Sequence, residues 1–149
     1  MARLSQWAQP VAAPLLRIAL AVPFFRSGLT RWEGFLSLSP STTYLFAEEF
    51  KLHLFGGAYA LPVPALMAHI TAVAEITLPV LLVVGLATRL AALGLLGMIG
   101  VIQLIVPGGW ADFHLPWAAI AIAIIALGPG KLSLDHIVDR RVSAQRAGA

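Results

Sequence analysis

The fold is decided by the stretch from Val63 to Val84, which reads VPALMAHITAVAEITLPVLLVV. Its only ionisable side chains are His69 and Glu75. About 20 mostly apolar residues are enough for an α-helix to cross the hydrocarbon core of a bilayer. Pro62 precedes the stretch and Gly85 follows it, as is typical of residues at helix ends. The stretch therefore predicts a transmembrane helix spanning about residues 63–84.

Three further segments have the same apolar character, namely residues 11–30, 90–106 and 113–127. The first contains Arg17 and Arg26, and the second contains one polar amide, Gln103. The third is short, and a short span is accommodated by local thinning of the bilayer or by packing against longer helices. We therefore expect an all-α membrane protein, a bundle of four transmembrane helices.

The composition of the whole chain agrees with this fold class. Of its 149 residues, 59% are hydrophobic and 11% are charged, and the mean hydropathy is +0.86. Soluble domains carry about 25% charged residues, so a soluble enzyme is excluded. There is no cysteine, which excludes disulfides, thiolate metal sites and iron–sulfur clusters. We expect one domain over residues 1–142, followed by a flexible cytoplasmic tail over residues 143–149.

The basic residues predict the orientation. The N-terminal flank, the second connection and the C-terminal segment hold Arg3, Arg17, Arg89, Lys131, Arg140, Arg141 and Arg146. The other two connections hold only Arg31 and Lys51, together with several carboxylates. Because Lys and Arg concentrate in cytoplasmic loops, both termini are expected in the cytoplasm of a bacterium, with the bundle in the inner membrane. The pI near 10.0 then reflects membrane topology and gives no reason to expect nucleic-acid binding.

The first extracytoplasmic loop is expected to contain a short amphipathic helix at the membrane interface. Residues 41–43, Ser-Thr-Thr, can cap its N-terminus. Its apolar side chains would be Tyr44, Leu45, Phe46, Phe50 and Leu54. A similar cytoplasmic helix is expected after Ser133, with Leu134, Ile137 and Val138 on one side.

Small residues in the last two spans suggest close helix packing. Since lipid is as apolar as leucine, helices in a bilayer associate largely through such residues. They are Gly94, Gly97, Gly100, Ala119, Ala123 and Ala126. Packing within the bundle is one interpretation, and contact with a second copy of the chain is the other.

The polar residues of the spans are the candidate ligand-binding residues: Arg26, His69, Glu75 and Gln103. At about 1.5 Å per residue, Arg26 and His69 lie at similar depth in the outer half of the membrane. A charge inside the bilayer needs a partner or water, so an Arg26–Glu75 pair is expected. The pair has two interpretations, a register-fixing contact or a role with a substrate or proton. Catalytic residues cannot be assigned.

Two prolines favour a small polar cavity between the first two spans. Pro79 and Pro23 each leave a backbone carbonyl without its helical donor, and such groups are tolerated only beside protein or a wet cavity. The histidines show no paired spacing for metal ligation, and His69 is the sole mid-span candidate for a haem ligand. A hydrogen-bonded structural role for His69 is favoured over haem. No metal is expected, whereas a bound quinone or lipid fits such a cavity.

Residues 75–79 (EITLP) and 85–92 (GLATRLAA) resemble the DoxX family of small bacterial membrane proteins, whose second helix carries a glutamate followed by a turn close to G-L-x-T-R. Arg17, Phe24, Gly28 and Arg31 fit the opening motif of that family, and residues 128–135 (GPGKLSLD) fit its usual close. The resemblance implies a four-helix membrane bundle. Arg89, at the turn, is most simply a topology or register residue.

The resemblance also implies a link to redox chemistry, since the family takes its name from a subunit associated with a thiosulfate:quinone oxidoreductase. One hypothesis is therefore an accessory subunit of a quinone-linked redox system without stand-alone catalysis. The alternative is a scaffold or assembly factor for a membrane or periplasmic partner, or for maturation of a metal-binding peptide. Transport or metal handling at the outer mouth is a third hypothesis. Homo-oligomers are compatible with each.

Overall fold

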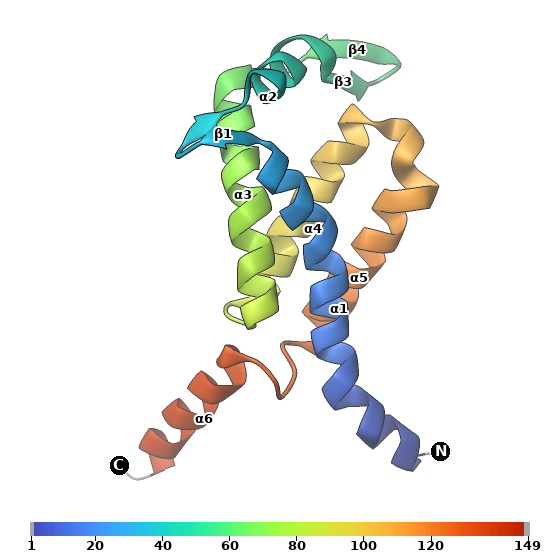
Figure 1. Cartoon of the computed structure of the whole chain (residues 1–149). Helices are drawn as coiled ribbons and strands as arrows, with labels where there is room; N and C mark the ends of the chain where they lie inside the picture. Colours follow the sequence, from blue (N-terminus) through green and yellow to red (C-terminus); the bar gives the residue numbers. More distant parts are fainter. Residues whose placement is uncertain (1, 148–149) are drawn as a thin grey trace.

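The computed structural model describes residues 2–147 and contains a bundle of four long helices (Figure 1). They are α1 (Ala2–Thr30), α3 (Pro64–Val84), α4 (Thr88–Ile105) and α5 (Leu115–Leu127). A 3₁₀ turn, η2 (Pro107–Gly109), and a π-helical turn, η3 (Trp110–His114), lengthen the last span at its start. All four segments are long and apolar enough to cross a membrane. The predicted all-α membrane bundle is confirmed.

The helices form a ring in which α1 packs against α3 and α5, and α4 packs against the same two helices. Figure 1 shows that α1 begins at one end of the bundle and that the C-terminal helix α6 (Leu134–Ala147) lies at the same end, which we call the terminal end. The connection between α1 and α3 covers the other end, which we call the hairpin end.

The connection from α1 to α3 is more structured than expected. It contains two antiparallel β-hairpins, β1 (Trp32–Gly34) with β2 (Ser37–Leu38), and β3 (Lys51–Leu54) with β4 (Gly57–Ala60). Between them lies a helix of two parts, α2 (Pro40–Tyr44) and the π-helical η1 (Leu45–Glu49).

The details of the expected loop helix were wrong in two respects. Its N-cap is Ser39, whose Oγ accepts from the backbone N–H of Thr42 at 3.2 Å, so the helix starts before residues 41–43. It ends at Glu49, with Phe50 as its C-cap, and Leu54 belongs to a strand. Phe46 is buried against Leu61 and Ala68, because it fills the hairpin end of the bundle.

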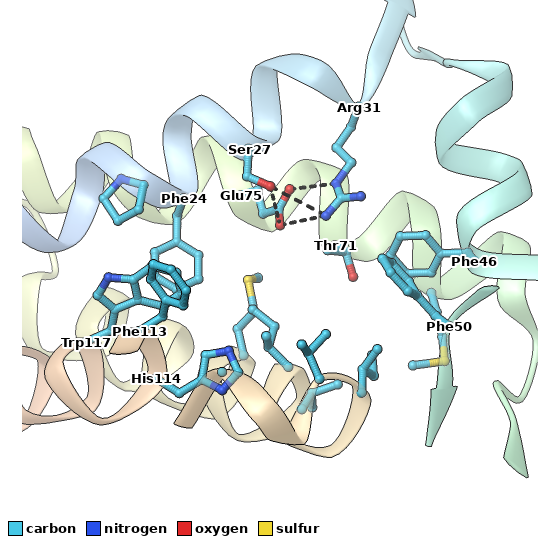
Figure 2. Close-up of a pocket in the computed structure, with 18 of the residues that line it drawn as sticks. Phe24, Ser27, Arg31, Phe46, Phe50, Thr71, Glu75, Phe113, His114 and Trp117 are labelled. Carbon is cyan, nitrogen blue, oxygen red and sulfur yellow. Dashed lines mark hydrogen bonds and ion pairs between the residues drawn. The ribbon is translucent and has the colours of Figure 1, made fainter. Parts of the chain in front are cut away.

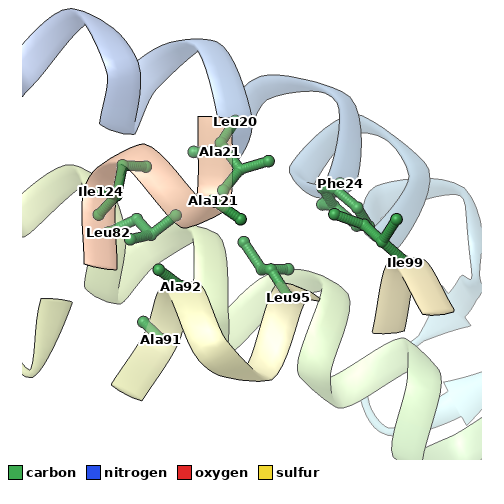
Figure 3. Close-up of a cluster of buried hydrophobic side chains, with 10 residues drawn as sticks. All are labelled: Leu20, Ala21, Phe24, Leu82, Ala91, Ala92, Leu95, Ile99, Ala121 and Ile124. Atoms are coloured by element: carbon green, nitrogen blue, oxygen red, sulfur yellow. The ribbon is translucent and has the colours of Figure 1, made fainter. Parts of the chain in front are cut away.

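The main hydrophobic core lies towards the terminal end, where all four helices contribute (Figure 3). Its buried side chains are Leu20, Ala21, Phe24, Leu82, Ala91, Ala92, Leu95, Ile99, Ala121 and Ile124. Large apolar side chains outside this core point away from the bundle, as lipid-facing side chains do. The packed core leaves the hairpin half of the bundle open for a cavity.

The expected small-residue packing is only partly formed. A Cβ built on Gly94 would meet Leu78, but one built on Gly97 or Gly100 would meet nothing within 4 Å. Ala119 and Ala126 are exposed and Ala123 is half-buried, while Ala121 is the buried alanine of α5. The buried small residues of these two helices are instead Ala91, Ala92 and Ala121.

The C-terminal helix α6 starts after Ser133, as expected, with Ser133 Oγ accepting from the backbone N–H of His136 at 3.2 Å. Leu134, Ile137 and Val138 are exposed on it. The helix continues past Ser143 to Ala147, where a flexible tail was expected. Residues 148–149 of that expected tail lie outside the described residues.

Candidate ligand-binding site

A polar cluster joins α1 to α3 inside the bundle. The guanidinium of Arg31 donates from Nε to Glu75 Oε2 at 2.9 Å and from Nη2 to Glu75 Oε1 at 3.2 Å (Figure 2). Ser27 Oγ also donates to Oε1, at 3.2 Å. The side chain of Glu75 is 2% exposed and that of Arg31 is 14% exposed. Such a forked pair is the strong form of the carboxylate–guanidinium contact.

Gly28 allows this cluster to form. A Cβ at residue 28 would lie 2.9 Å from the backbone carbonyl carbon of Glu75, closer than Cβ atoms approach. The absence of a side chain brings α1 against α3 at that level. Ser27 and Arg31, which directly follows α1, are four residues apart. Their side chains therefore lie on the same side of the turn that contains Gly28, and both reach Glu75.

The cluster forms part of the wall of a cavity of about 480 Å³. This volume is within the range of about 300–1,000 Å³ typical of small-molecule sites. The wall is mostly apolar and aromatic, and all four transmembrane segments and the covering loop contribute to it. Among its members are Phe24, Phe46, Phe50, Met67, Thr71, Met98, Ile102, Phe113 and Trp117.

His114 supplies a second polar group to the cavity (Figure 2). It is 3% exposed, and its ring contacts the ring of Trp117 at 5.9 Å between centroids. Nδ1 donates to the amide oxygen of Gln103 at 2.6 Å, and Gln103 in turn donates to the carbonyl of Pro107. Because the amide oxygen requires the proton on Nδ1, Nε2 of a neutral His114 is an acceptor.

Arg31 has donor capacity beyond Glu75. Its Nη1 makes no hydrogen bond within the part of the chain that the structure describes. The guanidinium carbon also lies 5.5 Å from the centroid of the Phe46 ring, a cation–π contact that orients it. The cavity therefore offers a donor on one wall and an acceptor on another, in otherwise apolar surroundings.

The expected Arg26–Glu75 pair is wrong, since Arg31 takes that place. Arg26 is exposed on the outside of α1. His69 is also exposed, and its Nδ1 donates to the carbonyl of Ala65 at 2.8 Å, one turn earlier in α3. Neither side chain lines the cavity. All four transmembrane segments line the cavity, where a space between the first two alone was expected.

The phase of α1 distinguishes the two arginines. Its buried residues, Arg17, Leu20, Ala21, Phe24 and Gly28, follow the three- and four-residue spacing of one helix face. Continuing that spacing leads to Arg31. Arg26 is out of phase with it and lies on the exposed side of α1.

A family model named DoxX matches residues 12–108, which is more than half of the chain. The matched region contains Ser27, Gly28, Arg31 and Glu75. The chain belongs to the DoxX family. No curated protein and no solved structure matches it.

Two of the motifs that resemble the DoxX family meet at the terminal end of this DoxX chain. Asp135, from the closing motif, accepts from the backbone N–H groups of Ala87 and Thr88 at 2.7 and 2.9 Å. These residues belong to the turn between α3 and α4, where Ala87 has a φ of 48°. Burial alone would raise the pKa of Asp135, but the hydrogen bonds from Thr88 and Ala87 and the charge of Arg17 hold it below its ordinary value.

Arg17 completes this terminal contact. It is 2% exposed and donates to the carbonyls of Leu82 and Leu132, which ties α1 to α3 and to the segment before α6. Arg89 is exposed at the start of α4, beside Gly128. These residues hold the terminal end together and lie far from the cavity. Among the described residues, no group of three or more His, Asp or Glu has metal-binding geometry.

Proposed function

We propose that this DoxX protein binds a quinone-like molecule in the cavity and acts as an accessory subunit of a quinone-linked redox system. The observation that carries the proposal is the placement of Arg31 and His114 on the wall of an apolar, aromatic cavity inside a membrane bundle. An oxidised quinone carbonyl accepts a hydrogen bond, as Arg31 Nη1 can supply. A reduced quinol hydroxyl donates one, as His114 Nε2 can receive.

The apolar wall suits the rest of such a molecule. Aromatic side chains such as Phe24 and Trp117 can lie against a flat ring. The Glu75 carboxylate already accepts three hydrogen bonds from Arg31 and Ser27, so its main role in this proposal is to hold Arg31 in place.

Fluorescence titration tests the binding. Short-chain quinone analogues added to the purified protein should quench the fluorescence of Trp117. Loss of this quenching in the Trp117→Phe variant would identify Trp117 as the source of the signal. Met98→Trp fills the cavity and should abolish saturable quenching, whereas His69→Leu, outside the cavity, should not. Absence of saturation in the unaltered chain, or equal quenching in Met98→Trp, contradicts the proposal.

The proposed orientation places both termini in the cytoplasm and the hairpin end outside, in a bacterial inner membrane. The terminal end carries Arg89, Lys131, Arg140 and Arg141, and the hairpin end carries more acidic than basic residues. Because the chain has no cysteine, single cysteines at exposed Ser41 and Ser143 can be labelled with impermeant reagents in intact cells. Only the cysteine at position 41 should react, because position 143 would lie in the cytoplasm.

A scaffold or assembly role is the second candidate function. Both hairpins carry uncovered apolar residues near their turns: Phe35 is 95% exposed, Leu36 is 66% exposed and Phe55 is fully exposed. Exposed apolar groups of this kind favour contact with another protein or with lipid. Co-purification of a stoichiometric partner that is lost in a Phe35→Ser, Phe55→Ser double variant would support this candidate.

A further inference from the structure

A second hollow lies between α1 and α3, on the side of their contact that faces away from the cavity. It has a volume of about 280 Å³. All of its lining residues except Arg26 are apolar: Ala21, Val22, Phe25, Pro79, Val80, Val83 and Val84. Val22, Val80, Val83 and Val84 are exposed, so this groove opens towards the surrounding lipid.

Arg26 places a permanent positive charge at the hairpin side of the groove. It is exposed and forms no ion pair or hydrogen bond within residues 2–147 that the structure describes. It lies four residues before the end of α1, which places its Cα about 6 Å inside the span. A guanidinium at this depth cannot lose its proton and requires an anion or water.

We propose that this groove binds one anionic phospholipid, with the headgroup phosphate on Arg26 and an acyl chain along the valines. Charge complementarity accounts for the headgroup, since a phosphate matches the guanidinium fork. The groove accounts for the acyl chain, because its volume falls just below the range for drug-sized ligands and its lining is entirely apolar, with Arg26 contributing only its aliphatic stem. The site is separate from the quinone cavity and does not depend on it.

We favour a lipid phosphate over a carboxylate of a second copy of this chain as the anion on Arg26. The chain has seven acidic residues, and the candidate spans contain two of them, Glu75 and Asp112. Glu75 is buried and engaged by Arg31 and Ser27. Asp112 lies in η3, after the end of α4, and Glu33 and Glu48 belong to the loop that covers the hairpin end. A membrane lipid presents its phosphate at the level that the side chain of Arg26 can reach.

Spin-labelled lipids test the proposal on the purified chain in phosphatidylcholine vesicles. The measured quantity is the relative association constant of spin-labelled phosphatidylglycerol against spin-labelled phosphatidylcholine, obtained from the immobilised spectral component. We expect a preference for phosphatidylglycerol that falls about fivefold in Arg26→Gln, the ratio expected for loss of one arginine beside an anionic headgroup. Arg26→Lys should retain most of the preference.

Two further variants separate the groove from general charge attraction. Val83→Trp fills the groove without changing charge and should lower the preference as Arg26→Gln does. Lys51→Gln removes a positive charge at the same end, outside the groove, and should leave the preference nearly unchanged. Unaltered thermal unfolding of Arg26→Gln shows that the exposed substitution leaves the fold intact.

Three results would overturn the proposal. One is an unchanged preference in Arg26→Gln, and another is an equal loss in Lys51→Gln. The third is co-purification of a protein that Arg26→Gln releases, because this would show that the anion on Arg26 belongs to a partner protein. Quinone binding concerns the other cavity, so a failure of the protein to bind quinone would leave the result of the lipid experiment unaffected.

Discussion

Gly28 lies against the backbone of Glu75, so closely that any side chain at residue 28 would overlap it. The contact lies at the level where Ser27 and Arg31 bind the Glu75 carboxylate. One glycine thus sets both the approach of two helices and the position of the polar cluster on the cavity wall. The cavity and the helix packing are therefore coupled at this point.

Gly28→Ala should separate α1 from α3 and destabilise the bundle. Overpacking of a tight contact costs about 1–3 kcal/mol, and the neighbouring atom here is backbone, which cannot rotate away. Gly97→Ala is the matched control, because a Cβ there meets nothing within 4 Å. Unfolding in mixed detergent measures both variants. Equal stability of the two would show that the α1–α3 contact is looser than described.

The Arg31–Glu75 pair should show strong coupling in a double-mutant cycle. Arg31→Gln or Glu75→Gln alone leaves a buried charge without its partner, which costs about 3–5 kcal/mol. The double variant should lose much less than the sum, since neither charge remains. Additive losses would mean that the two side chains act independently. Arg26→Gln, on the exposed side of α1, should have little effect on unfolding.

Gln103→Leu should destabilise the hairpin half of the bundle through His114. The substitution leaves the buried Nδ1 of His114 without its acceptor, and an unsatisfied buried polar group costs about 1–3 kcal/mol. Gln103→Glu keeps an acceptor at the same place and should retain more stability. Thermal unfolding compares the two, and a Leu variant as stable as the Glu variant would contradict the role of this hydrogen bond.

Asp135 should make stability depend on acidic pH. Its pKa is lower in the folded protein than in the unfolded chain, so its contribution is complete above the ordinary carboxyl pKa and is lost as the pH falls through the lowered one. Asp135→Asn should be less stable at neutral pH and should lack this part of the acid dependence. Thermal unfolding of both chains from neutral to strongly acid pH measures the difference, and parallel curves would exclude the effect.

The spans could be predicted because membrane insertion depends on local composition, which the sequence carries directly. Residues 63–84 show this most clearly, since a long apolar run has few alternative folds. Glu75 was also identifiable as a residue of interest, because a carboxylate in a span requires an explanation. Its partner was predicted wrongly because Arg26 was chosen for its place inside the first span and its reach, whereas helical phase favours Arg31.

The covering loop could not be predicted from local patterns. The turn between β3 and β4 has positive φ at both Phe55 and Gly56, a conformation usually signalled by Asn-Gly or Asp-Gly. Leu36 in the other hairpin also has a φ of 58°. Leu36 and Phe55 both lie at exposed hairpin turns, whose geometry requires such angles although these residue types give no sequence signal of them.

Helix α1 is bound to α3 at two levels, through Arg17 towards the terminal end and through Arg31 at the hairpin end. Sliding or rotation of α1 along α3 would break both attachments. A ligand that widens the cavity should therefore displace the opposite wall, formed by α4, η3 and the start of α5, before it separates the first two spans.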